Sequence, residues 1–262
     1  MAILQVSYFS NAMSREVTFN ALIPMDMREN NQSDRQKPMK SLYLLNGYSG
    51  SHTDWISFTR IRELSEKYHL AVFMPAGENS FYVDEEDRRS NHGEYVGNEL
   101  VAYTRQLFPI STKREDTFIG GLSMGGFGAI RNGLKYSENF SRIIALSSAI
   151  MTYKIKNAKP GFVDAGGGDY KYFTSVFGDL SKLEGSDNDP EALLRNLKQT
   201  NQPIPNIYLA CGTEDFLLDV NHLFRDFLSH EGVDYTYVEG PGDHTWDFWD
   251  EYIEKALEWI YT

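Results

Sequence analysis

The feature that most constrains the fold of this chain is a serine flanked by glycines two positions away on either side, at residues 121–125. The pattern is typical of a buried strand that turns sharply into a helix, with Ser123 at the tip. So tight a turn has strained dihedral angles and close neighbours, which glycine at 121 and 125 tolerates. The flanking residues predict a strand over 117–120 and a helix over 124–136. A simpler interpretation is a glycine-rich turn in which Ser123 only caps the helix.

The remaining sequence alternates between strand and helix patterns. Alternating or continuous apolar runs predict strands over 4–10, 15–23, 41–46, 70–75, 142–149, 206–211 and 235–239, the first two as an antiparallel pair at a sheet edge. Apolar residues at helical spacing, Leu107 and Leu223 among them, predict helices over 55–68, 94–108, 190–200, 219–231 and 245–261. This alternation predicts one α/β domain with a mostly parallel central sheet and helices on both faces.

Three segments interrupt the alternation. Residues 25–40 and 76–93 are polar and read as connections, the second of which carries His92 and a run of acids. Residues 150–189 hold three consecutive glycines and several aromatic residues without a long periodic element. An irregular insertion after the carboxyl end of a strand often covers a site, so we expect a cap-like segment here. The alternative is a surface excursion without a role in function.

The composition narrows the range of partners. The formal net charge of −12 and the isoelectric point near 5.0 leave no basic face for a phosphate backbone, so we expect no nucleic-acid partner. The single cysteine, Cys211, cannot form an internal disulfide and reads as a small core residue. The chain starts without a basic region and a long apolar run, and no apolar run approaches the roughly 20 residues of a membrane span. We therefore expect a cytoplasmic protein without a membrane partner, and homo-oligomerisation stays open.

A serine hydroxyl is a poor nucleophile at neutral pH, so Ser123 would need a base within hydrogen-bond reach. Sites in open parallel sheets form at the carboxyl ends of the strands. Of the six histidines, His244 alone follows the last predicted strand at that end, in a tight Gly-Pro-Gly-Asp-His turn. We therefore expect His244 to be the base. The histidines set aside lie at the wrong edge, on a helix or in other loops: His52, His69, His92, His222 and His230.

The base needs an acid to orient it, and Asp215 is the expected one. Asp215 follows the predicted strand over 206–211, and His244 follows the next predicted strand, over 235–239. The chain order is therefore serine, aspartate, histidine. Three other acids compete for this role. Glu214 would project to the opposite side of the turn, Asp219 reads as a helix cap, and Asp243 adjoins the histidine too closely.

Acyl transfer at a serine produces an oxyanion, which backbone N–H groups stabilise. One donor is expected to be Met124, the residue after the serine. For the other we favour Tyr48, in a loop where glycines at 47 and 50 let the backbone approach a substrate. No metal-binding, phosphate-binding or dinucleotide-binding pattern is present, so we expect no cofactor and no metal.

Three segments together carry a resemblance to a known family. They are the run from Ser111 into Gly-Gly-Leu-Ser-Met-Gly-Gly, the upstream Leu-Leu-Asn-Gly-Tyr-Ser-Gly, and the downstream Gly-Asp-His-Thr-Trp-Asp-Phe-Trp. Over nearly its whole length the chain resembles the esterase D-like α/β-hydrolases, and within them bacterial tributyrin or acetyl esterases.

The resemblance implies an α/β-hydrolase fold and a serine carboxylesterase that hydrolyses short-chain acyl esters, acetyl to butyryl, without a cofactor. It assigns the triad to Ser123, Asp215 and His244 and the oxyanion donors to Met124 and Tyr48. The same branch includes S-formylglutathione hydrolases, feruloyl esterases and acetylxylan esterases, and a non-catalytic hydrolase-fold binding module is a further alternative. This chain departs from the family at two places: Asn46 stands where relatives often have histidine or serine, and the acidic loop at 84–87 is particular to this chain. The identity of the small-molecule ester substrate therefore stays open.

Overall fold

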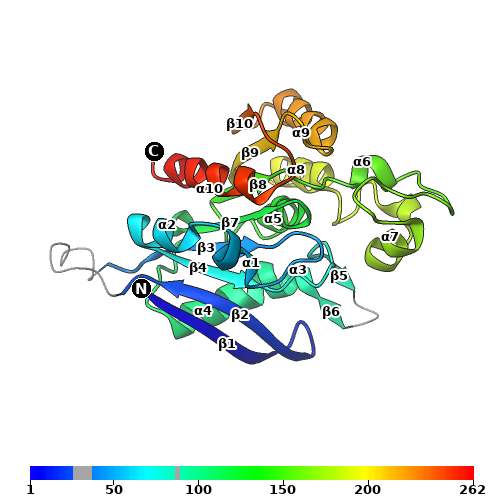
Figure 1. Ribbon diagram of the computed structural model, residues 1–262. Helices are drawn as coiled ribbons and strands as arrows, with labels where there is room; N and C mark the ends of the chain where they lie inside the picture. Colours follow the sequence, from blue (N-terminus) through cyan, green and yellow to red (C-terminus); the bar gives the residue numbers. More distant parts are fainter. Residues whose placement is uncertain (26–36, 86–88) are drawn as a thin grey trace.

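The computed structural model describes residues 1–25, 37–85 and 89–262 of the 262-residue chain (Figure 1). Its centre is an eight-stranded sheet in the order β1-β2-β4-β3-β7-β8-β9-β10. The strands are β1 (Ala2–Ser10), β2 (Arg15–Ile23), β3 (Lys40–Leu45), β4 (Leu70–Pro75), β7 (Thr117–Leu122), β8 (Arg142–Leu146), β9 (Asn206–Gly212) and β10 (Tyr235–Gly240). β1 pairs antiparallel with β2 and β2 antiparallel with β4, whereas every pairing from β4 to β10 is parallel. The predicted mostly parallel sheet with an antiparallel edge pair is therefore confirmed.

Helices cover both faces of this sheet (Figure 1). One face packs against α1 (Asp54–Phe58), α2 (Ile61–Tyr68) and α10 (Trp246–Ile260). The other packs against α4 (Leu100–Leu107), α5 (Met124–Lys135), α8 (Pro190–Gln199) and α9 (Leu218–Glu231). Because β3, β4 and β7 lie between two such layers, almost all of their residues are buried, which explains their continuous apolar sequences.

The predicted helix over 55–68 is wrong as one element, because the chain leaves the helix between α1 and α2. Thr59 is extended, with φ −135° and ψ 169°. Its hydroxyl donates to the carbonyl of Trp55 at 2.5 Å and accepts from the N–H of Ile61 at 3.2 Å. A threonine side chain that bonds nearby backbone groups in this way competes with the helical hydrogen bonds and ends the helix.

Other boundaries also differ from the prediction. The helix expected over 94–108 starts as α3 (His92–Glu94) and passes through a π-helical turn, η4 (Tyr95–Glu99), before α4. Leu107, an apolar residue at helical spacing, is 51% exposed, and Leu223, which we expected to face inward, is 50% exposed. The remaining helices among the described residues are η5 (Arg114–Asp116), α6 (Thr152–Ile155), α7 (Tyr170–Phe177) and η6 (Leu180–Lys182). Three of them, α6, α7 and η6, fall in the insertion expected to be irregular.

The connection over 76–93 is less exposed than its sequence indicates. It contains a two-stranded sheet of β5 (Asp84–Glu85) and β6 (Ser90–Asn91), and it buries Phe81, Tyr82 and Val83. His92, expected on a polar loop, is 2% exposed, and burial lowers its pKa to about 4. Most of the connection expected over 25–40, and residues 86–87 of the acidic loop, lie outside the described residues.

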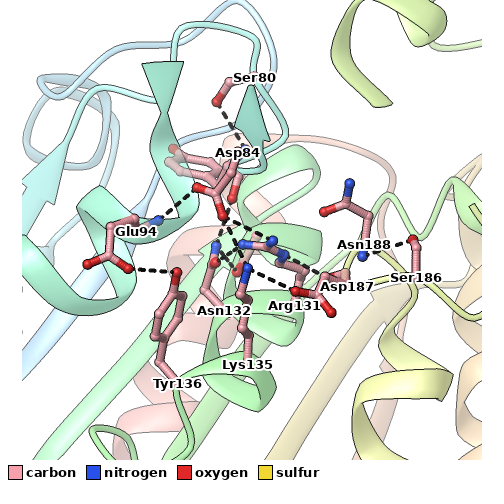
Figure 2. A network of polar contacts seen from close by, with 12 residues as sticks. Ser80, Asp84, Glu94, Arg131, Asn132, Lys135, Tyr136, Ser186, Asp187 and Asn188 are labelled. Carbon is pink, nitrogen blue, oxygen red and sulfur yellow. Dashed lines mark hydrogen bonds and ion pairs between the residues drawn. The ribbon is translucent and has the colours of Figure 1, made fainter. Parts of the chain in front are cut away.

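A polar network fastens this connection to α5 (Figure 2). The carboxylate of Asp84 lies 3.3 Å from the guanidinium of Arg131, 3.3 Å from the ammonium of Lys135 and 2.9 Å from the N–H of Glu94. The side chain of Arg131 is only 1% exposed and donates also to the carbonyl of Asp187 at 3.0 Å. Burial alone would raise the pKa of Asp84, but the charges of Arg131 and Lys135 and the Glu94 N–H bring it below its ordinary value.

We expect Asp84→Asn to lower the free energy of unfolding by about 2 kcal/mol at pH 7, because it leaves the buried Arg131 without its carboxylate. Asp187→Asn is the matched control, because the Asp187 side chain is 73% exposed and pairs only with Lys135 among the described residues, and it should cost below about 1 kcal/mol. Because the pKa of Asp84 is lower in the folded state than its ordinary value of 3.8, the ionised carboxylate stabilises the fold above pH 3.8. This stabilisation is lost as the pH falls through the folded-state pKa. Urea titrations at pH 7 and near pH 3 test this, and an Asp84→Asn deficit of the same size at both would contradict it.

Candidate active site

Ser123 lies at the turn between β7 and α5 in a strained conformation, with φ 53° and ψ −118°. The turn brings main-chain atoms so close that a Cβ at Gly121 would lie 2.4 Å from the carbonyl oxygen of Gly125. A Cβ at Gly125 would lie 2.5 Å from the carbonyl oxygen of Leu45. Ser123 occupies the N-cap position of α5, but its hydroxyl makes no capping hydrogen bond. The simpler interpretation, that the serine only caps the helix, is therefore wrong.

The structure brings together the three side chains that the sequence singled out. Nε2 of His244 lies 3.0 Å from Oγ of Ser123, and Nδ1 lies 2.9 Å from Oδ2 of Asp215. Ser123 follows β7, Asp215 follows β9 and His244 follows β10. Because these strands are parallel, their carboxyl ends bring the three residues to one edge of the sheet. An ionised Asp215 accepts from Nδ1–H, which leaves Nε2 as the acceptor for the serine hydroxyl.

The carboxylate of Asp215 is set up to stay ionised. The residue is 4% exposed, and burial alone would raise its pKa. The hydrogen bond and charge of His244, together with the Leu217 N–H that donates to Oδ1 at 2.9 Å, bring the pKa below its ordinary value. Asp215 therefore presents a negative charge to the imidazole at neutral pH.

Two aromatic rings pack against the imidazole of His244. The ring of Phe216 lies 4.7 Å from the His244 ring, and that of Trp249 lies 4.8 Å away at 89°. Trp249 is itself fixed, because its indole N–H donates to the hydroxyl of Ser147 at 3.1 Å. Sequence reasoning passed over both residues, although Phe216 adjoins Asp215 and Trp249 lies on the first turn of the helix that follows His244.

The three competing acids have other partners. The carboxylate of Glu214 accepts from the N–H of Gly242 at 2.6 Å, which connects the loop after β9 to the loop after β10. Asp243 accepts from the main-chain N–H of His244 at 2.7 Å. Asp219 lies in the first turn of α9 and not at its N-cap, which is Leu217, so its predicted capping role is wrong. None of these three acids contacts the imidazole nitrogens in the part of the chain that the structure describes.

The two predicted oxyanion donors face the same cavity as Ser123. Met124 is the first residue of α5, so its N–H has no acceptor within the helix. Tyr48 lies in the loop after β3, and β3 is the neighbour of β7 in the sheet. This adjacency brings both residues to the edge of the sheet where Ser123 lies, and their role as oxyanion donors stays a prediction.

The cavity above Ser123 has a volume of about 590 Å³. Residues of the 150–189 insertion form part of its wall, including Met151, the segment 164–168, Tyr172 and Phe173. Tyr48, Phe216 and Trp246 also line the cavity, and the ring of Tyr48 packs against that of Tyr172 at 5.3 Å. Many of the lining side chains are aromatic or aliphatic, as in sites that bind small organic molecules.

Within residues 1–25, 37–85 and 89–262, no cluster of three or more histidine, cysteine, aspartate or glutamate side chains is arranged to hold a metal ion. No helix in these ranges is long and apolar enough to cross a membrane.

Comparisons with known proteins agree with this arrangement. The Esterase family model, described as "Putative esterase", matches residues 10–260. An acetyl esterase of Caldicellulosiruptor saccharolyticus is 49% identical over 262 residues, which are 99% of this chain and 98% of the relative. Among solved structures, the substrate-bound fluorophosphonate-binding serine hydrolase FphF of Staphylococcus aureus has a TM-score of 0.86 at 30% identity, covering 100% of this chain and 98% of that one. The S-formylglutathione hydrolase FrmB of the same organism has a TM-score of 0.84 at 31% identity, covering 100% and 99%. The predicted α/β-hydrolase fold is confirmed.

We expect Asp215→Asn to leave the fold intact and to reduce the reactivity of Ser123 toward a fluorophosphonate by about 10³- to 10⁴-fold, because asparagine favours the wrong imidazole tautomer. The measurement is the second-order labelling rate. Glu214→Gln is the matched control, since it removes the neighbouring carboxylate charge but keeps an acceptor for the Gly242 N–H, and it should label within a few-fold of the wild type. Equal rates in the two variants would contradict the assignment of Asp215.

Proposed function

The chain belongs to the Esterase family and is a carboxylic ester hydrolase, and from this premise we propose that it cleaves short-chain acyl esters through an acyl-enzyme on Ser123. The observation that carries the mechanism is the unbroken hydrogen-bonded series from Ser123 through His244 to Asp215, with contacts of 3.0 and 2.9 Å. The acetyl esterase relative, similar over almost the whole chain, supports acetyl as the preferred acyl group.

In the proposed mechanism the hydroxyl of Ser123 attacks the ester carbonyl while Nε2 of His244 takes its proton. Asp215 holds the imidazole in the required tautomer and stabilises the imidazolium that forms. The N–H groups of Met124 and Tyr48 donate to the developing oxyanion. The intermediate collapses when His244 returns the proton to the leaving alcohol, and water then releases the acid by the same steps in reverse.

The side chains that line the cavity favour the proposed acyl groups of a few carbons, acetyl to butyryl. Phe81, Met151 and Phe173 are bulky and buried, and they narrow the space on the side of the insertion. Their rings and the thioether leave an apolar surface that suits a short alkyl chain. The rest of the cavity of about 590 Å³ is available to the alcohol.

For the partners and the location we keep the expectations drawn from the sequence. The proposed partner is a small-molecule ester, and the net charge of −12 argues against a nucleic acid. The proposed location is the cytoplasm, which the single, buried cysteine supports.

A second candidate is a thioesterase acting on S-acyl substrates. It is favoured by the likeness to FrmB, an S-formylglutathione hydrolase, at 31% identity over the whole chain. The same serine, base and oxyanion donors would attack a thioester carbonyl, so the two candidates differ in the leaving group alone.

We expect Ser123→Ala to reduce hydrolysis of p-nitrophenyl acetate by at least about 10³-fold, because the nucleophile is absent. The measurement is initial-rate kinetics. Ser148→Ala is the control, because Ser148 is also buried and its hydroxyl has no hydrogen-bond partner among the described residues. Retention of activity in Ser123→Ala would remove the proposal.

A panel of p-nitrophenyl esters should give a kcat/KM that is highest for acyl chains of two to four carbons and falls by more than about tenfold at eight, because longer chains meet the aromatic wall. A preference for the longest chains would contradict the proposed acyl size. S-acetyl and O-acetyl compounds assayed side by side decide between the two candidates, and a much higher kcat/KM for the thioester would favour the second.

A further inference from the structure

A fully buried tyrosine lies beneath the loop that carries one predicted oxyanion donor. Tyr82 is 0% exposed, and its hydroxyl lies 3.1 Å from both the main-chain oxygen and Oδ1 of Asn46. It does not line the cavity around Ser123. A Cβ at Gly77 would lie 2.3 Å from the same hydroxyl and 3.0 Å from the side chain of Met124, so these groups pack together under the serine turn.

Asn46 connects this hydroxyl to the loop. Its residue is 1% exposed, and Oδ1 accepts from the N–H of Gly77 at 3.0 Å as well as from the hydroxyl of Tyr82. With Oδ1 occupied in this way, the amide nitrogen points to the other side and donates to the carbonyl oxygen of Gly47 at 2.8 Å. The carboxamide is therefore held at both ends.

The contact with Gly47 matters because that carbonyl and the N–H of Tyr48 belong to one peptide group. A peptide group is planar and trans, so the direction of its C=O fixes the direction of its N–H. The Gly47 oxygen accepts from the N–H of Gly50 at 3.2 Å as well, so the side chain of Asn46 and the loop backbone together hold the direction of the Tyr48 N–H. The side chain of Asn79 accepts from the N–H of Ser49 at 2.6 Å, which fixes the next peptide group, between Tyr48 and Ser49.

The backbone of Tyr82 adopts a strained, left-handed conformation that contacts with α5 maintain. Its φ is 55°, and Glu78, Asn79 and Phe81 in the same segment also have φ between 49° and 57°. A left-handed conformation costs a non-glycine residue about 1 kcal/mol or more and persists only where surrounding contacts impose it. The carbonyl of Tyr82 accepts from the side chain of Asn132 on α5 at 3.0 Å. Two residues further on, Asp84 fastens the segment to Arg131 (Figure 2).

We propose that Tyr82 is a positioning residue for ester hydrolysis: through Asn46 it orients the peptide group of Gly47 and Tyr48, so that the Tyr48 N–H points at the oxyanion. This inference rests on the proposed function, because it assigns a role within the same site. Tyr82 touches neither the substrate nor the reacting atoms, and its effect passes through the Asn46 carboxamide.

The test compares Tyr82→Phe with the wild-type enzyme. The ring is kept and one hydroxyl is lost, so Asn46 is less firmly oriented and the oxyanion donor is misaligned. Removing a whole donor costs about 10²- to 10³-fold in kcat, and we expect misalignment to cost about 10- to 30-fold in kcat with KM changed less than about threefold. A trifluoromethyl ketone, which forms a tetrahedral oxyanion adduct with the serine, should bind more weakly by a similar factor.

Tyr43→Phe is the matched control. Tyr43 is also 0% exposed, and its hydroxyl is hydrogen-bonded at 2.5 Å to Thr104, outside the cavity around Ser123. This variant loses a buried hydroxyl of the same kind, so it should lose stability without a change in kcat or in ketone affinity. Equal losses of kcat in the two variants would mean that removal of a buried hydroxyl acts only through stability, and would overturn the proposal.

A double-mutant cycle with Asn46→Ala tests the route of the effect. If Tyr82 acts through Asn46, the double variant should be no worse than Asn46→Ala alone, whereas independent effects would multiply. Multiplied effects would overturn the proposal, as would a Tyr82→Phe variant with wild-type kcat. Should Tyr82→Phe fail to fold, Asn46→Ala alone must show the same selective loss of kcat and ketone affinity. A wild-type enzyme without activity on esters or thioesters would instead refute the proposed function.

Discussion

The close approach of three main-chain segments at Ser123 is the constraint on which the site depends. The serine turn, the end of β3 and the start of α5 come together so tightly that side chains at Gly121 and Gly125 would collide with backbone oxygens. This contact does two things at once. It turns Ser123 toward the cavity at the carboxyl edge of the sheet, and it places the loop after β3 next to the start of α5, whose first N–H groups have no acceptor within the helix. The serine and the two predicted oxyanion donors are thus positioned by the same backbone packing.

Much of this arrangement follows from local patterns in the sequence. Interior strands such as β4 are continuous apolar runs because both of their faces are covered, and the glycine spacing around Ser123 indicates its turn directly. His244 and Asp215 could be selected because parallel strands end at one edge, so their order along the chain limits the choice. The comparisons establish the family and the fold; the roles of the individual residues are part of the proposal.

The features that the sequence did not predict depend on specific side-chain contacts, several of them between distant residues. Tyr82 lies in a segment that reads as a polar loop, yet its ring belongs to the hydrophobic core and its polar groups bond Asn46 and Asn132, 36 and 50 positions away. The break at Thr59 depends on one hydroxyl that bonds nearby backbone, which periodicity does not register. Leu223 has helical spacing, yet it lies on the flank of α9, outside the stripe formed by Val220, Phe224 and Phe227.

The position of β10 has a consequence for how the molecule loses its activity. β10 is the last strand of the sheet, pairs among the described strands with β9 alone, and most of its residues are partly exposed. The nucleophile, in contrast, follows a central strand that is buried along its whole length. Fraying begins at edges, where fewer contacts must break. Warming should therefore detach the imidazole from a serine turn that is still folded, so that inactivation precedes melting and is reversible while the central strands hold.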